Sequence, residues 1–302
     1  MMNRKQMIMG LLLLAGCDSG EDKDFFSDDA QMPVTIETSL DADIIQTRAN
    51  VSSGSMGVFL GNANGYKPQY NVQYTYNGGW KASAPVYAGV PNATLHACYP
   101  YNVVTFTANS TTCTLTAQKY DAAKELYYAK ASSSIVNNKT PNATFAMTRA
   151  YSRLKLSIKR HATKYVGNCN ITNVNIKHST GNNFFVSRTL DISTGTNGGS
   201  ATANGWTYAL NTGNMAANAT NTAYDVLVPP QPVSGGLTIT LTIDGVNRAV
   251  TVPTAQFSNN LNAGQQYTIS LVITDAEIVL PASAVTVNDW GGVSNQDTDA
   301  GV

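Results

Sequence analysis

Residues 237–252 read LTITLTIDGVNRAVTV, and this stretch decides the fold class. Apolar and hydroxylated side chains alternate through 237–243, which is the pattern of a strand with one buried face and one solvent-exposed face. Asp244-Gly245 follows at once, and a second extended run continues to Val252. Two strands joined by Asp-Gly predict a β-hairpin with a type I′ turn.

The same alternation recurs in four other stretches, which are 34–40, 70–76, 154–159 and 267–273. The chain is 43% hydrophobic but only 13% charged, against about 25% charged in ordinary soluble domains. Thr, Asn, Ser, Gly and Tyr replace the missing charge, and these residues favour strands and turns. One short helix is predicted at 119–129, and loops are predicted at 195–205 and 211–221. The sequence therefore predicts an all-β protein.

The length of 302 residues suits two domains better than one small sandwich. A boundary is predicted near 146–151. The simplest architecture is two β-sandwiches in series. The predicted segments are a signal peptide (1–17), an acidic tether with a first strand (18–48), an N-terminal sandwich (49–148), a C-terminal sandwich (149–275) and a tail (276–302).

The N-terminus has the pattern of an export signal. Arg4 and Lys5 precede an apolar stretch at 7–14 that is too short to span a bilayer. Leu-Ala-Gly-Cys then ends at Cys17, which is the lipobox pattern of bacterial lipoproteins. We therefore expect cleavage before Cys17 and acylation of this residue. The alternative is a plain secretory signal with an incidental cysteine.

Charge is distributed unevenly along the chain. Residues 18–48 hold nine acidic and two basic residues, a net charge of −7, whereas residues 49–302 hold 15 basic and 10 acidic residues, a net charge of +5. The first segment therefore resembles a solvated tether. Because the whole chain is neutral, nucleic acid is not an expected partner.

Three cysteines remain if Cys17 is lipidated, and three is an odd number. Cys98 and Cys113 lie on neighbouring predicted strands and could form a disulfide. They could equally be buried free thiols that act as small apolar residues.

No catalytic constellation is evident in the sequence. The three histidines fit no metalloprotease motif and are expected to be ordinary surface or half-buried residues. The chain has no Gly-x-Ser-x-Gly elbow, no phosphate-binding loop and no Cys-x-x-Cys pair. A carboxylate pair assembled only in the folded state stays open. We expect neither an enzyme nor a bound cofactor or metal.

Taken together, four stretches make the chain resemble the fimbrillin family, the subunits of type V pili in anaerobic Gram-negative bacteria. They are the lipobox at Cys17, the segment 45–49 with its arginine, the segment 147–154 that leads into an alternating strand, and the segment 261–290 that ends in Asn-Asp-Trp. The resemblance spans nearly the whole chain. It implies two transthyretin-like β-sandwich domains.

The resemblance also implies a mechanism of assembly. A lipoprotein precursor reaches the outer membrane with its first strand in a groove of the N-terminal domain. A trypsin-like protease cuts after an arginine, the first strand leaves, and a C-terminal strand of another subunit replaces it. Such strand addition depends on an exposed sheet edge with an empty hydrophobic groove.

This chain has residues that fit each part of that mechanism. Arg48 is the only basic residue between Lys23 and Lys67, so cleavage is predicted between Arg48 and Ala49. The apolar side chains of the removable strand are Val34, Ile36 and Leu40, and those of the donor tail are Ile278, Leu280, Val285 and Val287. Two alternatives stay open: Arg48 is a linker arginine, and the tail is an ordinary final strand.

The leading hypothesis is a structural pilus subunit whose partners are other subunits, a trypsin-like protease and the outer membrane. A tip adhesin would accept a donor strand without giving one, and an anchor would keep its lipid and its first strand. A surface glycan-binding lipoprotein is the rival from another class, and the aromatic side chains of 70–76 would then face the ligand. A host or bacterial surface ligand is compatible with all of these roles.

Overall fold

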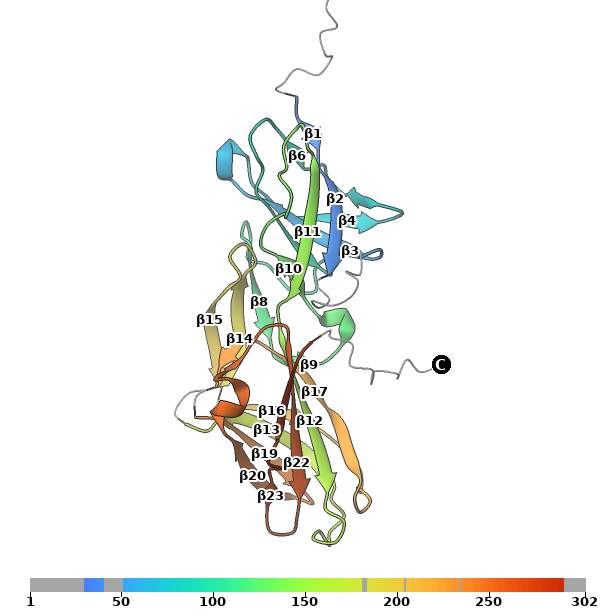
Figure 1. Cartoon of the computed structure of the whole chain (residues 1–302), viewed down its shortest axis with the longest axis vertical. Helices are drawn as coiled ribbons and strands as arrows, with labels where there is room; N and C mark the ends of the chain where they lie inside the picture. Colours follow the sequence, from blue (N-terminus) through green and yellow to red (C-terminus); the bar gives the residue numbers. More distant parts are fainter. Residues whose placement is uncertain (1–29, 41–50, 181–183, 204, 234, 291–302) are drawn as a thin grey trace, which may run out of the picture.

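The computed structural model describes residues 30–40, 51–180, 184–203, 205–233 and 235–290 (Figure 1). Throughout these ranges the chain forms β-strands and three short 3₁₀ turns, with no α-helix. The predicted all-β class is confirmed. The turns are η1 (Ala63–Gly65), η2 (Ala122–Lys124) and η3 (Thr254–Phe257).

A seven-stranded sheet forms the N-terminal part, in the order β2-β11-β10-β7-β3-β4-β5. Neighbouring strands are antiparallel except β2 and β11, which run parallel. The edge strands β2 and β5 approach each other, so the sheet curls around its core. The strands are β2 (Thr35–Leu40), β3 (Ser55–Leu60), β4 (Gln69–Tyr76), β5 (Trp80–Ala82), β7 (Leu95–Tyr99), β10 (Tyr127–Ala129) and β11 (Asn142–Arg149).

A small second sheet closes this core. It pairs β1 (Met32–Pro33) with β6 (Tyr87–Ala88) in antiparallel fashion. Ala88 and the preceding Val86 are buried in the same cluster as side chains of the seven-stranded sheet. Residues from both sheets therefore enclose one N-terminal core.

Two sheets share a second, larger core in the C-terminal part, as in a β-sandwich. One has the order β23-β22-β12-β17-β9, with β24 also paired to β22, and the other has the order β16-β13-β19-β20. The first consists of β9 (Gln118–Lys119), β12 (Ser152–Arg160), β17 (Thr220–Val228), β22 (Gln265–Ile273), β23 (Ile278–Val279) and β24 (Val285–Asp289). The second consists of β13 (Ile171–His178), β16 (Trp206–Ala209), β19 (Leu237–Ile243) and β20 (Val246–Val252), and a short pair joins β18 (Gln231–Pro232) to β21 (Asn260–Leu261).

The predicted hairpin is present as β19 and β20. Ile243 pairs with Val246, so that Asp244 and Gly245 form a two-residue loop. Their φ angles are 49° and 83°, and positive φ at both positions is the requirement of a type I′ turn. The prediction from the Asp-Gly pair is therefore confirmed.

A third core joins the two parts of the chain. It contains buried side chains from the N-terminal sheet, from Ala150 and Tyr151 after β11, and Leu227 of β17. A three-stranded sheet, β15-β14-β8, lies beside this junction and consists of β8 (Thr112–Thr116), β14 (Phe184–Asp191) and β15 (Thr196–Ala203).

The predicted division between residues 148 and 149 falls just before the last residue of β11, next to the short connection that leads to β12. However, β8 and β9 precede this point and pair with β14 and β17, which follow it. The two parts are thus joined by strand pairing as well as by the chain. The division into two domains stays a prediction.

The helix predicted at 119–129 is wrong. Asp121 accepts a hydrogen bond from the Ala123 backbone N–H, but the turn that it caps is only η2. Leu126 and Tyr128 then alternate into the junction core, and β10 pairs on both sides with β7 and β11. Long-range pairing therefore overrides the local helix propensity.

The loop predicted at 195–205 is also wrong, because most of it forms β15. This strand pairs with β14 from Thr196 to Ala203, through two register shifts. The Gly- and Thr-rich sequence of β15 shows no alternation of apolar and polar residues. This segment therefore forms a strand because it pairs with β14. The loop predicted at 211–221 is confirmed as far as residue 219, and β17 begins at Thr220.

Candidate functional site

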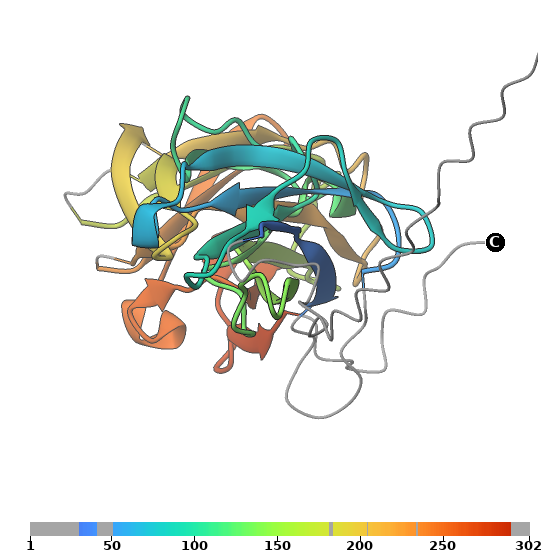
Figure 2. The ribbon, with the colours of Figure 1, turned by 90° about the horizontal axis from the view of Figure 1, so that it is seen from above.

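The first described strand segment begins at the end of the N-terminal part, at the top of Figure 1 and nearest the viewer in Figure 2. Met32 and Pro33 pair with β6, and the chain then crosses to the other sheet. The crossing is fixed by two backbone hydrogen bonds of 2.8 Å, from the Val34 N–H to the Val86 carbonyl and from the Thr35 N–H to the Pro141 carbonyl. From Thr35 to Leu40 the segment runs parallel to β11.

The side chains of this segment alternate between core and solvent. Val34, Ile36 and Thr38 are 6%, 7% and 6% exposed, whereas Thr35 and Glu37 face solvent. Val34 and Ile36 belong to the N-terminal core, and the Tyr74 hydroxyl donates to the Val34 carbonyl at 3.4 Å. Burial of two aliphatic side chains of this size contributes roughly 3–6 kcal/mol. The first strand segment therefore covers the N-terminal core and also contributes side chains to it.

Polar contacts fix the solvent side of the same segment. Asn142 donates from its Nδ2 atom to Glu37 Oε1 at 3.1 Å and accepts from the Thr35 hydroxyl at 3.2 Å. Asn138 donates to the Ala30 carbonyl at 3.0 Å. These exposed bonds set the register of β2 on β11 but add little stability in water.

Three of the predicted site residues lie outside the described residues, namely Cys17, Arg48 and Ala49. Leu40 is the last described residue of β2, and it is paired with Met147 in the ladder. Val51, the next described residue along the chain, is buried.

The predicted donor tail forms the outer edge of the C-terminal sheet. Both β23 and β24 pair antiparallel with β22. Ile278 is 4% exposed in the C-terminal core, Leu280 and Val285 pack against that core half-buried, and Val287 is 41% exposed. The tail therefore occupies the position of a final strand, and its use as a donor stays a prediction.

Trp290, the last described residue, is anchored at the junction between the two parts. Its ring is buried, and its backbone N–H donates to the Gly264 carbonyl at 2.7 Å. The Arg149 guanidinium lies 5.1 Å from the centroid of the ring and also donates to the Trp290 carbonyl. Arg149 therefore connects the end of β11 to the end of the tail.

Two ion pairs complete this anchor. Arg149 pairs with Glu125, which is only 4% exposed. Arg153 makes a bidentate contact with Asp225, with N–O distances of 2.8 Å and 2.6 Å, and lies 3.6 Å from the centroid of the Tyr120 ring. Removal of one partner from such a buried pair leaves an uncompensated charge, so each member stabilises the junction only while the other is present.

Sequence reasoning did not find these ion pairs. Arg149 and Arg153 both lie in the segment 147–154 that carried part of the resemblance, but their acidic partners lie on distant elements. The sequence alone shows that the two arginines lie close together at the start of an alternating strand, but it does not show which acidic residues they contact.

Among the described residues, the structure decides whether Cys98 and Cys113 form a disulfide. Cys98, Cys113 and Cys169 are free and buried. Burial raises the pKa of the Cys98 and Cys113 thiols to about 12. Both side chains act as apolar members of the junction core, as in the second of the two alternatives.

Among the residues that the structure describes, no group of three or more His, Cys, Asp or Glu side chains could hold a metal ion. Within the same ranges, no helix is long and apolar enough to cross a membrane. The expectation of surface or half-buried histidines is wrong for His96 and His178, which are 8% and 4% exposed. Burial lowers the pKa of His178, whose ring makes edge contacts with Phe184 and Phe185.

A family model described as fimbrillin-like matches residues 47–290, which is most of the chain. The chain belongs to the fimbrillin-like family. The resemblance seen in the sequence is confirmed. No curated protein matches this fimbrillin-like chain.

Solved structures share the fold of this fimbrillin-like protein at low identity. A candidate cell adhesion protein from Bacteroides uniformis is 20% identical, with a TM-score of 0.60, over 85% of this chain and 99% of that chain. A second candidate cell adhesion protein, from Bacteroides ovatus, is 14% identical, with a TM-score of 0.56, over 86% and 98%. A fimbrial protein from Bacteroides vulgatus is 10% identical, with a TM-score of 0.53, over 85% and 99%.

Proposed function

We propose that this protein is a structural subunit of a surface pilus that supports adhesion. The precursor is a lipoprotein acylated at Cys17 and held at the outer membrane. A trypsin-like protease cuts between Arg48 and Ala49, the first strand leaves, and the tail of another subunit enters the groove. Membership of the fimbrillin-like family supports the pilus role.

The observation that carries the proposal is the placement of the first strand. The buried side chains of the first strand complete the N-terminal core. Among the described residues, the backbone of this strand pairs only with β6 and β11. Loss of the strand would leave an apolar groove and an unpaired edge of β11. Such an edge templates another strand.

The tail has the sequence that this groove requires. Val285-Thr286-Val287 repeats the β-branched pattern of Val34-Thr35-Ile36. In this register Val285 takes the place of Val34, and Val287 takes the place of Ile36.

The direction of the tail also fits. β22 ends at Ile273, at the end of the molecule opposite β1 (Figure 1), and a turn at residues 274–277 folds the tail back. If this turn opens, the tail extends beyond the molecule towards the β1 end of a following subunit. The tail would then run in the direction of β2 and pair parallel with β11. Residues 278–289 reach about 40 Å when extended.

Insertion would bury the two valines of β24 more deeply than their present position does. In its present position β24 buries no side chain fully, and Val287 is 41% exposed. In the groove, both valines would reach positions that are less than a tenth exposed. Exchange would therefore gain burial for these two valines, while it would expose Ile278 and Trp290, which are buried in the folded chain.

The proposal is tested by an Arg48→Ala variant with Lys23→Ala as its matched control. Lys23 is the basic residue that precedes Arg48, and a cut there would leave the first strand in place. We expect Arg48→Ala to accumulate as a lipidated precursor without polymers, and Lys23→Ala to polymerise normally. Normal polymers from Arg48→Ala would contradict the cleavage step.

A further inference from the structure

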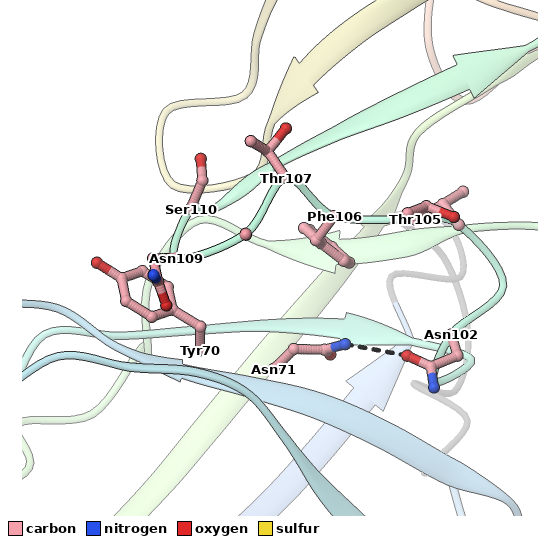
Figure 3. A pocket seen from close by; sticks show the side chains of 10 residues that line it. Tyr70, Asn71, Asn102, Thr105, Phe106, Thr107, Asn109 and Ser110 are labelled. Carbon is pink, nitrogen blue, oxygen red and sulfur yellow. Dashed lines mark hydrogen bonds between the residues drawn. The ribbon is translucent and has the colours of Figure 1, made fainter.

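A hollow lined by uncharged residues on the N-terminal part is separate from the position of the first strand (Figure 3). It lies between β4 and the loop that leads to β8, and its volume is about 590 Å³. Small-molecule sites commonly have volumes of roughly 300–1,000 Å³. The lining residues are Tyr70, Asn71, Asn102, Val104, Thr105, Phe106, Thr107, Ala108, Asn109 and Ser110.

The chemistry of the lining selects a class of ligand. None of the ten lining residues carries a charge; three are asparagines, three are Thr or Ser, and two are aromatic. Phosphate, sulfate and carboxylate groups would find no counter-charge here. Amides and hydroxyls that donate and accept hydrogen bonds, together with aromatic faces, match the hydroxyls and C–H faces of an uncharged sugar.

A β-bulge aims two of these side chains at the hollow. The register of β3 on β4 passes from Val58–Val72 to Leu60–Gln69, so that Tyr70 and Asn71 face the single intervening residue. Asn71 adopts a φ of 50°, which costs energy for a residue with a side chain. Bulges of this kind often redirect side chains at functional sites.

The carboxamide of Asn71 is held in a space that only glycine leaves open. A Cβ atom on Gly57 would lie 1.9 Å from Asn71 Oδ1. Asn71 Nδ2 donates to Asn102 Oδ1 at 3.0 Å (Figure 3), and Asn71 Oδ1 accepts from the Cys98 thiol. Among the described residues, Asn102 Nδ2 has no acceptor, which leaves it as a fixed donor for a ligand.

Two aromatic rings complete the site. Tyr70 is 38% exposed and lines one end of the hollow (Figure 3). Phe106 lies between the loop and β4, and its ring centroid is 4.8 Å from that of buried Phe59. Phe106 therefore has a rigid support, whereas Tyr70 is free to stack on a ligand.

We propose that this hollow binds an uncharged oligosaccharide, with Tyr70 as the stacking platform and Asn102 as a hydrogen-bond donor. The site would give the subunit an adhesive surface along its side. Because it is distinct from the strand groove, the proposal does not depend on strand exchange.

An oligosaccharide array with neutral, sialylated and sulfated members tests the proposal on the uncut full chain. We expect binding to neutral members that persists at about 1 M salt, where charge interactions are screened. Tyr70→Ala should weaken binding at least ten-fold. Asn102→Asp, which keeps the acceptor for Asn71 but removes the donor, should also weaken it.

Tyr87→Ala is the matched control, because Tyr87 is 40% exposed on β6, outside the hollow. It should bind as the unaltered chain does. Absence of binding, binding to charged members alone, or an equal loss in Tyr87→Ala would overturn the proposal. Circular dichroism of each variant establishes that the fold is retained.

Discussion

At the scale of single residues, a few side chains hold the first strand in place, some by apolar burial and others by hydrogen bonds. Ile36 fills the core, whereas its neighbour Glu37 faces solvent and accepts a hydrogen bond from Asn142. The strand is thus anchored by apolar burial and kept in register by polar contacts. These two contributions can be separated by mutation.

Ile36→Ala should lower the free energy of unfolding of the uncut chain by about 2 kcal/mol, because it leaves a cavity in the N-terminal core. Glu37→Ala, on the same strand, should change it by less than about 0.5 kcal/mol. Urea denaturation of both variants measures the difference. Equal effects would show that β2 does not contribute through its buried side chains.

Arg149 makes a different contribution, at the junction. Arg149→Met should lower the free energy of unfolding by about 3 kcal/mol, because Glu125 would stay buried without its partner. Lys155→Met is the control: Lys155 Nζ lies 4.0 Å from Asp225 in a more exposed position, so its loss should cost less than about 1 kcal/mol. A small effect of Arg149→Met in thermal or urea denaturation would argue against the ion pair as a stabiliser of the junction.

At the scale of elements, local signals predicted some strands and missed others. The hairpin at 237–252 was predictable because its alternation and its Asp-Gly turn lie within one short stretch. The parallel pairing of β2 with β11 was not, because its partners are more than a hundred residues apart. β15 was missed because its partner, and not its own sequence, makes it a strand.

In the candidate site, too, local sequence patterns predicted some features and missed others. The alternation of Val34 and Ile36 predicted which side chains face a core, and the structure places both in the N-terminal core. The ion pairs at Arg149 and Arg153 depend on contacts between separate elements, and the bulge at Tyr70 and Asn71 depends on the register between β3 and β4. No pattern in a single sequence contains that information.

The tail offers a mutation that separates folding from exchange. Val287 is 41% exposed in the folded chain, so Val287→Asp should fold normally. In a donor, the carboxylate would reach the buried position of Ile36, and burial of an unpaired charge is strongly unfavourable. Polymer formation should fall at least ten-fold, as measured by electron microscopy and by denaturing gels of unheated samples.

Thr286→Asp is the control for this variant. Thr286 is exposed on the same strand and, in this register, takes the place of Thr35, which faces solvent, so a carboxylate there would stay in water in a donor. It should polymerise as the unaltered chain does. Normal polymers from Val287→Asp would refute insertion of the tail in this register.

At the scale of the whole molecule, the removable segment and the tail lie in different parts of the chain. The first strand completes the N-terminal core, and the tail leaves the C-terminal sheet at the opposite end of the molecule (Figure 1). This arrangement suits head-to-tail joining of identical subunits, in which each groove receives the tail of the preceding copy. Cleavage after Arg48 would also remove the segment of net charge −7 and leave subunits of net charge +5.

The N-terminus and intact mass of protein sheared from the cell surface test removal of the first strand most directly. We predict a chain that begins at Ala49, without lipid and without residues 18–48. A chain that begins at acylated Cys17 would mean that β2 stays in its groove, and it would contradict assembly by strand exchange.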